Sequence, residues 1–394
     1  MNGDKYSRIV IVTYSFYDFD LNRISIGGLE TYVKDLLGIS GVIDCEMTVY
    51  QLSVNVNNQQ IKYNGANIIN YPVVKSSLMK SAYQCSFDTI FNKENDGETF
   101  FIVAAETMNI KSPYKNVATI QHGIYHDSPD EYMFANRSIK SHFLRLLYRH
   151  YKCQKEASRL FNIKNIVCVD YNYFNWFRTI NNIPKDHMIK VIPNHVSDFI
   201  TKDELKEKLK AREHKKKIVF ARRFVDTRGT LMFINVSKRL LEERDDVNIT
   251  FAGDGPLRSH ITKSLSKYSS FHLTSFDSSD SISFHKNYDI SVVPSISTEG
   301  TSLSLLESMA SGCYPLASHV GGMTNIILDG FNGTLFYPQE ESLYHSIVEV
   351  LSMTDSHFNM ICENAYMSCI SAFGKEKWLN SWADFILSTL NAGN

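Results

Sequence analysis

The sequence lacks any regular arrangement of cysteines, although it contains seven of them. They stand at positions 45, 85, 153, 168, 313, 362 and 369, and no two have C-x-x-C spacing. Disulfide frameworks and zinc ribbons both depend on regularly spaced cysteines. We therefore expect reduced thiols and a cytoplasmic protein.

Long apolar runs and an excess of charge of one sign are missing as well. No uninterrupted apolar stretch is long enough to cross a bilayer. The polar start leads straight into a strand-like run at 8–15, without the apolar core of a secretory leader, so secretion is not expected. Lys and Arg number 41 against 42 Asp and Glu, a formal net charge of -1. This balance excludes a surface that binds nucleic acid or membrane all over, so we expect no nucleic-acid partner, and any basic binding surface must be local.

Common cofactor and metal motifs are also missing. No G-x-G-x-x-G follows the first strand-like run, and no G-x-x-x-x-G-K-[ST] occurs in the chain. His, Cys and carboxylates do not cluster at metal-ligand spacing, and we interpret Asp18-Phe19-Asp20 as a solvated turn. The sequence therefore predicts no cofactor and no metal requirement.

Short apolar runs alternating with helical patterns are present in two separate series. In the first half the runs are 8–15, 46–52, 99–106, 116–123 and 165–171, with a helix at 28–39. In the second half they are 216–224, 247–255 and 288–297, with helices at 233–243 and 302–312. Such runs are typical of parallel strands covered on both faces, and 394 residues exceed what one core supports. We predict two doubly wound, Rossmann-like α/β domains that face each other across a cleft, with ligands at the carboxyl ends of the strands.

The boundary between the two domains is predicted near residue 195. We assign 1–195 to an N-terminal domain and 216–375 to a C-terminal domain. The stretch between them, 196–215, contains DELKEKLKAREHKKK, which is highly charged and shows no apolar face. We interpret it as an interdomain linker.

The strongest functional signal is a pair of glutamates around a strand-to-helix turn. Glu299 lies at the turn and Glu307 inside the following helix, which Ser302 is placed to cap and Gly312 to close. Free amides and the helix dipole favour an anion there, and these amides belong to Gly300, Thr301, Ser302 and Leu303. Glu307 is suitably placed to accept hydrogen bonds from the hydroxyls of a ribose. The alternative is a capped surface helix with two solvated glutamates, which the spacing alone favours.

Two arginines upstream fit the same anion. Arg223 and Arg228 follow a predicted strand and could neutralise a diphosphate. Arg222 is adjacent, and strand alternation favours Arg223 as the inward-facing residue. Either arginine alone could equally be solvated.

Two positions of the first half are weaker candidates. Gly28 opens a helix, and a missing side chain lets backbone approach a ligand, although Gly-Gly also marks simple turns. His122 follows a predicted strand at its carboxyl end, where α/β sites form. A satisfied buried histidine is the alternative for it.

In order and spacing these motifs resemble the family-4 retaining glycosyltransferases of GT-B fold. The matching elements are Pro294-Ser295, Glu299 to Glu307, Gly321-Gly322, Asn332-Gly333, ARRFVDTRG at 221–229, GDGP at 253–256, GGLETYV at 27–33 and QHG at 121–123. The register of the Arg-x4-Lys-Gly motif also favours Arg223. Three positions depart from the family pattern: Thr301-Ser302 replaces Phe-Gly, Arg228 replaces Lys, and His195 replaces the Gly of Pro-Asn-Gly.

The resemblance implies a reaction and a division of labour. A hexosyl unit would pass, with retention and without metal, from a UDP- or GDP-sugar to a hydroxyl of a glycan or lipid-linked acceptor in bacterial O-antigen, capsule or lipopolysaccharide synthesis. The N-terminal domain would bind the acceptor, the C-terminal domain the donor, and a last helix at 376–394 would return to the N-terminal domain. The implied catalytic residues are His122, Arg223, Arg228 and Glu299. The implied donor-binding residues are Gly28, Arg223, Arg228, Glu299, Gly300, Thr301, Ser302, Leu303 and Glu307.

Two other functions on the same fold stay open at this point. One is a catalytically silent partner subunit of another glycosyltransferase, which the intact glutamates and arginines disfavour. The other is a nucleotide-sugar epimerase, which product analysis would distinguish.

A basic amphipathic helix is predicted at 137–161. Six cations, Lys140, Arg145, Arg149, Lys152, Lys155 and Arg159, accompany an apolar stripe and a single acid, Glu156. Such a helix can lie on the anionic inner face of the plasma membrane. It can equally pack its apolar stripe against the N-terminal domain, and the pattern does not separate these alternatives.

Overall fold

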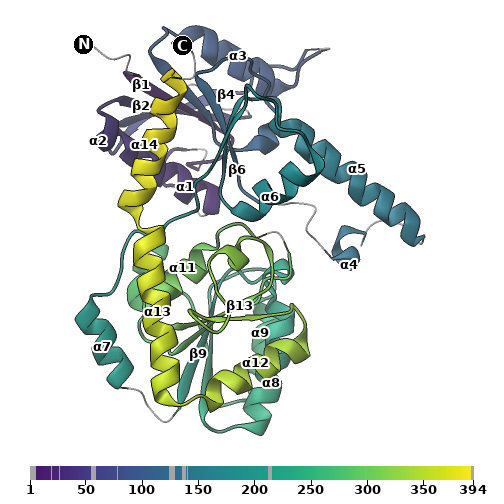
Figure 1. Ribbon diagram of the computed structural model, residues 1–394, viewed down its shortest axis with the longest axis vertical. Helices are drawn as coiled ribbons and strands as arrows, with labels where there is room; N and C mark the ends of the chain where they lie inside the picture. Colours follow the sequence, from purple (N-terminus) through teal and green to yellow (C-terminus); the bar gives the residue numbers. More distant parts are fainter. Residues whose placement is uncertain are drawn as a thin grey trace. The chain divides into compact units, whose positions relative to one another are not determined.

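The computed structural model of the chain is shown in Figure 1. It describes residues 6–18, 20–25, 27–54, 59–77, 79–123, 129–134, 139, 141–211, 215–297 and 299–391. The chain forms two compact units. Unit 1 contains Met1–His122, Lys140–Pro193 and Glu376–Asn394, and unit 2 contains Gly123–Ile139 and Asn194–Lys375.

Unit 1 is built on an eight-stranded sheet with the order β3-β4-β2-β1-β5-β6-β7-β8. The strands are β1 (Arg8–Thr13), β2 (Glu46–Ser53), β3 (Gln59–Tyr63), β4 (Ala66–Pro72), β5 (Thr99–Val103), β6 (Val117–Gln121), β7 (Asn165–Cys168) and β8 (Met188–Val191). All neighbouring pairs are parallel except β3 and β4, which are antiparallel at the edge. The helical segments are α1 (Gly28–Leu36), η1 (Leu37–Ile39), α2 (Ser40–Ile43), α3 (Ala82–Glu94), η2 (Glu106–Met108), α5 (His142–Leu160), α6 (Tyr171–Ile180) and α14 (Lys375–Asn391).

The sheet of unit 1 separates two apolar cores, as the alternation of β1 requires. Ile9 and Ile11 point into a core that includes Val33 of α1. Val10 and Val12 point into the opposite core with Phe87 of α3. Because side chains alternate along a strand, one continuous apolar run fills both layers.

Helix α14 brings the end of the chain into unit 1. Its side chains Trp378, Trp382 and Phe385 belong to the same core as α1. The indole N–H of Trp382 donates to the hydroxyl of Tyr32 at 3.0 Å. Both polar atoms are thereby satisfied within an otherwise apolar layer.

Unit 2 contains a six-stranded, wholly parallel sheet with the order β11-β10-β9-β12-β13-β14. The strands are β9 (Lys216–Ala221), β10 (Val247–Ala252), β11 (Phe271–Thr274), β12 (Ile290–Val293), β13 (Tyr314–Ser318) and β14 (Thr334–Phe336). The helical segments are α4 (Asp130–Met133), α7 (Lys202–Lys210), η3 (Asp226–Arg228), α8 (Thr230–Glu243), α9 (Arg258–Leu265), η4 (Ser278–Asp280), α10 (Ser281–His285), α11 (Leu303–Ala310), η5 (Gly321–Asn325), α12 (Glu340–Ser352) and α13 (Asp355–Phe373). The prediction of two Rossmann-like α/β units with parallel sheets is confirmed.

The stretch 196–215 is not the linker without an apolar face that its charge suggested. Residues 202–210 form α7, and Leu205 and Leu209 are buried in the main core of unit 2. A complete capping box at Thr201 and Glu204 starts the helix. Two leucines four residues apart suffice to attach a helix that is charged elsewhere, because they fall on one face.

Candidate functional site

The candidate site lies at the carboxyl edge of the unit 2 sheet, where the neighbouring strands β9 and β12 end. The backbone N–H of Arg222 still pairs with Ala252 O at 3.0 Å, which fixes Arg222 at the end of the sheet. Beyond the strands, the two loops are joined by a hydrogen bond from Ile296 N–H to Thr227 O at 3.1 Å. The loops therefore hold the side chains that follow β9 and β12 close together.

Glu299 stands between two guanidinium groups in this loop pair. Arg222 donates to one carboxylate oxygen at 2.5 Å, and Arg228 donates to the other. The exposed fractions of the side chains are 7% for Arg222, 5% for Glu299 and 33% for Arg228. Arg222 also donates to the hydroxyl of Ser295. The cluster is thus closed on the Arg222 side and open to solvent at Arg228.

The two guanidiniums decide the charge state of the cluster. Burial opposes ionisation of Glu299, but the charges of Arg222 and Arg228 outweigh it, so the pKa of this carboxyl is lowered. Burial lowers the pKa of Arg222, and the charge of Glu299 opposes that change. Two cations and one anion leave a net charge of +1 at a strand end, and the accessible part of that charge is Arg228. Such a cluster attracts an anion.

Glu307 lies close to the same cluster, on the next helix. Burial raises the pKa of its carboxyl, while the Ser281 hydroxyl and the charge of Arg222 act in the opposite direction. Glu299 is buried and Glu307 half-buried, so the alternative of two solvated surface glutamates is wrong. The structure thereby brings together the predicted residues Arg228, Glu299 and Glu307.

The N-terminus of α11 adjoins Glu299. Ser302 is the N-cap residue, but its side chain makes no capping bond; its hydroxyl instead lies 3.3 Å from that of Ser304 and also bonds to Glu299. The predicted closure at Gly312 is confirmed by its φ of 68° directly after the helix. Gly300, Thr301 and Ser302 thus form the turn, and Leu303 is the first residue of α11, where the positive end of the helix dipole favours an anion.

Gly321 and Gly322 pack against the turn that contains Glu299. The N–H of Gly322 donates to Glu299 O at 2.9 Å. Gly321 has a φ of 51°, and a Cβ at this position would lie 1.9 Å from Glu299 O. Only glycine permits this approach, so the pair sets the position of the Glu299 backbone.

The prediction that Arg223 faces inward is wrong. Arg223 is exposed, and Arg222 is the buried partner of Glu299. After Arg222 the chain leaves the sheet in a tight turn, closed by Val225 N–H on Arg223 O at 2.9 Å, which leaves Arg223 outside. The turn at 253–256 packs on the Arg222 backbone, since a Cβ on Gly253 would lie 2.2 Å from Arg222 O.

Three further polar residues of the cluster were not singled out by sequence reasoning. They are Ser295 on Arg222, Ser281 on Glu307, and Asn194, whose side-chain amide donates to Thr301 O at 2.7 Å. Asn194 precedes α7 by several residues and is far in sequence from Thr301, so no local pattern links it to the turn. Ser295 was visible only as part of the Pro-Ser motif.

Gly28 and His122 lie in unit 1. His122 Nε2 is 2.7 Å from Ala104 O, and its ring contacts Tyr32 edge-on with centroids 5.2 Å apart. A carbonyl oxygen only accepts, so Nε2 carries the proton, and burial lowers the pKa of the ring. The neutral ring therefore keeps Nδ1 as an acceptor. Gly28 is the exposed first residue of α1, and a Cβ there would meet no atom within 4 Å.

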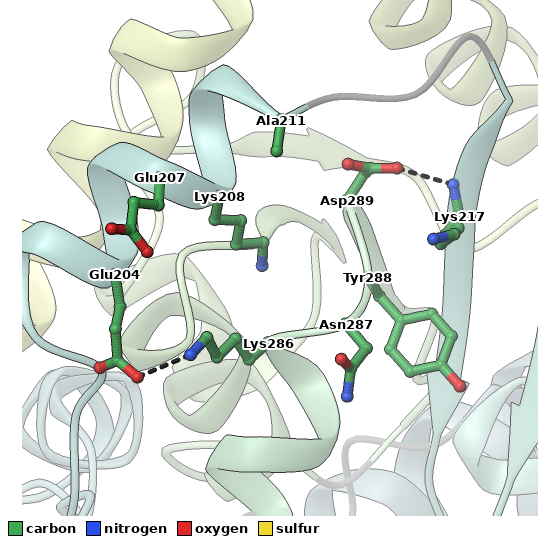
Figure 2. Close-up of a pocket in the computed structure, with 9 residues that line it drawn as sticks. All are labelled: Glu204, Glu207, Lys208, Ala211, Lys217, Lys286, Asn287, Tyr288 and Asp289. Atoms are coloured by element: carbon green, nitrogen blue, oxygen red, sulfur yellow. Dashed lines mark hydrogen bonds and ion pairs between the residues drawn. The ribbon is translucent and has the colours of Figure 1, made fainter.

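A separate cavity of about 300 Å³ opens on unit 2 at the amino edge of the sheet, away from this cluster. Figure 2 shows Lys286 paired with Glu204, at 2.6 Å, and the backbone N–H of Lys217 bonded to Asp289 at 2.8 Å. Lys208 donates to Ser311 O at 2.8 Å. The ammonium groups of Lys208 and Lys286 are thus engaged by the protein itself, and the cavity contains none of the predicted site residues.

Within the part of the chain that the structure describes, no three His, Cys, Asp or Glu side chains are grouped to hold a metal ion. Across those residues, too, we find no helix with the length and apolar character needed to cross a bilayer.

Comparison with known proteins agrees with this architecture. Residues 201–366, which lie in unit 2, match the family described as Glycosyl transferases group 1. An uncharacterized glycosyltransferase of Methanocaldococcus jannaschii is 28% identical over 187 residues, which cover 44% of this chain and 47% of that protein. The chain spans no more than about half the length of the curated relatives it matches.

Solved structures resemble nearly the whole chain. The glycosyltransferase WaaG, involved in lipopolysaccharide biosynthesis, has a TM-score of 0.66 at 16% identity, over 96% of this chain and 99% of that one. The Anabaena protein HepE in complex with UDP has a TM-score of 0.67 at 13% identity, over 97% and 100%. The fold is GT-B.

Proposed function

We propose that this chain, whose residues 201–366 match the group 1 glycosyltransferases, is a retaining, metal-independent transferase of the family-4 type. It would move a hexosyl unit from a UDP- or GDP-sugar to a hydroxyl of a glycan or lipid-linked acceptor. The pathway we propose is bacterial surface polysaccharide synthesis, with the protein in the cytoplasm. The UDP complex of HepE and the lipopolysaccharide role of WaaG are consistent with this donor and this pathway.

The observation that carries the proposal is the cluster of Arg222, Glu299 and Arg228 beside the start of α11. The net positive charge of the cluster suits a diphosphate, and so does the start of α11, where the helix dipole favours an anion. In such a transfer, negative charge grows on the leaving diphosphate. Arg228 is the cation that a phosphate can reach, since a third of its side chain is exposed. In this proposal Arg222, and not Arg223, is the second arginine of the site, and its charge keeps Glu299 ionised.

The two glutamates take different parts of the donor in this proposal. Glu307 accepts hydrogen bonds from the ribose, and Glu299 contacts the sugar hydroxyls while orienting both guanidiniums. The proposal keeps the roles expected for two residues of unit 1, Gly28 for the donor phosphate and His122, through Nδ1, for a sugar or acceptor hydroxyl. No side chain is assigned as an enzymic nucleophile.

Calorimetry with UDP and with GDP tests this placement. Glu307→Ala should weaken binding of the better nucleotide by about 1.5–3 kcal/mol, because bonds to a charged acceptor are lost. Glu299→Gln should not weaken nucleotide binding, because it removes a negative charge from the cluster, yet it should lower turnover with the corresponding sugar nucleotide, because the contact of Glu299 to the sugar strengthens during transfer.

Glu363→Ala is the matched control, since Glu363 is an exposed carboxylate on α13 of the same unit. Wild-type affinity in Glu307→Ala would remove Glu307 from the donor site. No binding of either nucleotide by the wild-type protein would favour a silent partner subunit instead.

A further inference from the structure

Helix α5 exposes its apolar side chains to solvent. The exposed fractions are 66% for Phe143, 53% for Leu144, 51% for Leu146, 50% for Leu147 and 57% for Tyr151. The helix extends away from the unit 1 sheet in Figure 1, and only Ala157 and Leu160 near its C-terminal end are buried. The sequence alternative in which this stripe packs on the domain is therefore wrong. An exposed apolar patch of this size marks an interaction surface.

The exposed apolar residues share one side of the helix. At about 100° per residue, Phe143, Leu147 and Tyr151 follow one another along the helix, with Leu144 and Leu146 beside them. The basic residues fall on the opposite side. They are Arg145, Arg149, Lys152, Lys155 and Arg159, and all but the exposed Lys155 are half-buried. The polar side is thus the more covered one, which reverses the arrangement of an ordinary surface helix.

Positive charge is concentrated on this element. The helix contains these five cations and one carboxylate, Glu156, whereas the whole chain has a formal net charge of -1. Lys155 and Arg149 stand at the two borders of the apolar side. Long basic side chains at such borders can extend their charged ends to phosphates while their stems stay in apolar surroundings.

We propose that α5 docks on the surface of an anionic lipid membrane, with its apolar side among the acyl chains and its cations at the level of the lipid phosphates. This surface goes beyond the proposed glycosyl transfer and does not depend on it. The combination of an apolar side with a strongly basic side is what distinguishes a helix lying in a membrane interface. A second copy of the chain fits less well, because pairing two apolar faces brings the border cations Arg149 and Lys155 of both copies near one another.

Flotation with vesicles tests the proposal. The full chain should bind vesicles that contain phosphatidylglycerol, bind pure phosphatidylcholine vesicles at least tenfold more weakly, and dissociate as salt rises. Leu146→Glu/Leu147→Glu and Arg145→Glu/Arg149→Glu should each reduce binding to phosphatidylglycerol vesicles at least tenfold.

Matched controls carry the same changes elsewhere on exposed helix surfaces. Met360→Glu/Met367→Glu places two acids on exposed apolar positions of α13, and Lys206→Glu/Lys210→Glu reverses two exposed cations of α7. Both controls should bind vesicles like the wild type. Failure of the wild type to bind, or equal binding by the α5 variants, overturns the proposal. So does an apolar-side variant that dissociates a dimer without affecting vesicle binding.

Discussion

At the scale of single residues, the structure reverses the prediction for two adjacent arginines. Arg222 is buried against Glu299 and Ser295, and Arg223 is exposed. The difference arises where β9 ends, because one residue remains paired to β10 and the next enters the turn.

Substitution of Arg222 should lower the free energy of unfolding strongly, whereas substitution of Arg223 should hardly change it. Arg222→Ala leaves the buried Glu299 with one cationic partner, and we expect a loss of unfolding free energy of about 3–5 kcal/mol. Arg223→Ala, the matched control, should change it by less than about 0.5 kcal/mol. Urea denaturation measures both, and similar losses in the two variants would contradict the placement of Arg222.

Glu106 should give the protein a distinct pH dependence. Burial raises the pKa of this carboxyl to about 8, and its Oε2 atom is buried without a hydrogen-bond partner among the described residues. The folded state thus keeps a proton that the unfolded chain has released above its ordinary pKa of 4.5. Stability that depends on this proton is present below pH 4.5 and is lost as pH rises towards 8.

Glu106→Gln removes that dependence. Between pH 5 and 8 the wild type should lose stability relative to the variant, by at most about 1.4 kcal/mol per pH unit. Urea denaturation at three pH values measures the difference, with Glu98→Gln, an exposed carboxyl of the same unit, as the control. Parallel wild-type and Glu106→Gln profiles would show that Glu106 is ionised in the folded protein.

At the scale of elements, the turns at the ends of strands set the geometry of the site. Gly321 and Gly330 both have positive φ, 51° and 72°, yet only Gly321 lies against the backbone of Glu299. Alanine substitutions at these two positions form a matched pair. Both add the strain of a left-handed backbone conformation, and only the substitution at Gly321 adds a steric clash.

Gly330→Ala should cost about 1–2 kcal/mol, as expected for a left-handed residue alone. Gly321→Ala should cost about 1–3 kcal/mol more, because the added Cβ must displace the Glu299 carbonyl. It should also weaken nucleotide binding if the turn holds the donor. Equal stability losses in denaturation would mean that the turn adapts to the side chain.

Local pattern located some elements and missed others. Apolar runs in the sequence predicted the strands β1, β2, β5 to β7, β9, β10 and β12, because a strand that is buried on both faces needs a continuous apolar sequence. The antiparallel β3 and β4 were not predicted, although Asn64-Gly65 between them is a typical hairpin turn. Helix α7 was mistaken for a linker, since its charges conceal two leucines that meet the core only in three dimensions.

At the scale of the whole molecule, the chain end belongs to unit 1, so a change there should affect the two units differently. Trp382→Ala removes a fully buried indole from the unit 1 core and should cost about 3–5 kcal/mol. Hydrogen exchange should show lost protection in β1 and β2 but not in β9 and β12. Leu387→Ala, at a position 37% exposed on the same helix, should leave both units protected. Equal loss of protection in unit 2 would contradict independent cores.

The sequence by itself determined the two parallel sheets and the glutamates and arginines at the end of β9 and start of α11. These features are local, because strand period, turn glycines and helix punctuation act over a few residues. Only the tertiary structure decided that Arg222 rather than Arg223 meets Glu299, that 202–210 packs on unit 2, and that α5 exposes its apolar side. Each of these depends on whether residues distant in sequence cover a side chain, and no local pattern contains that information.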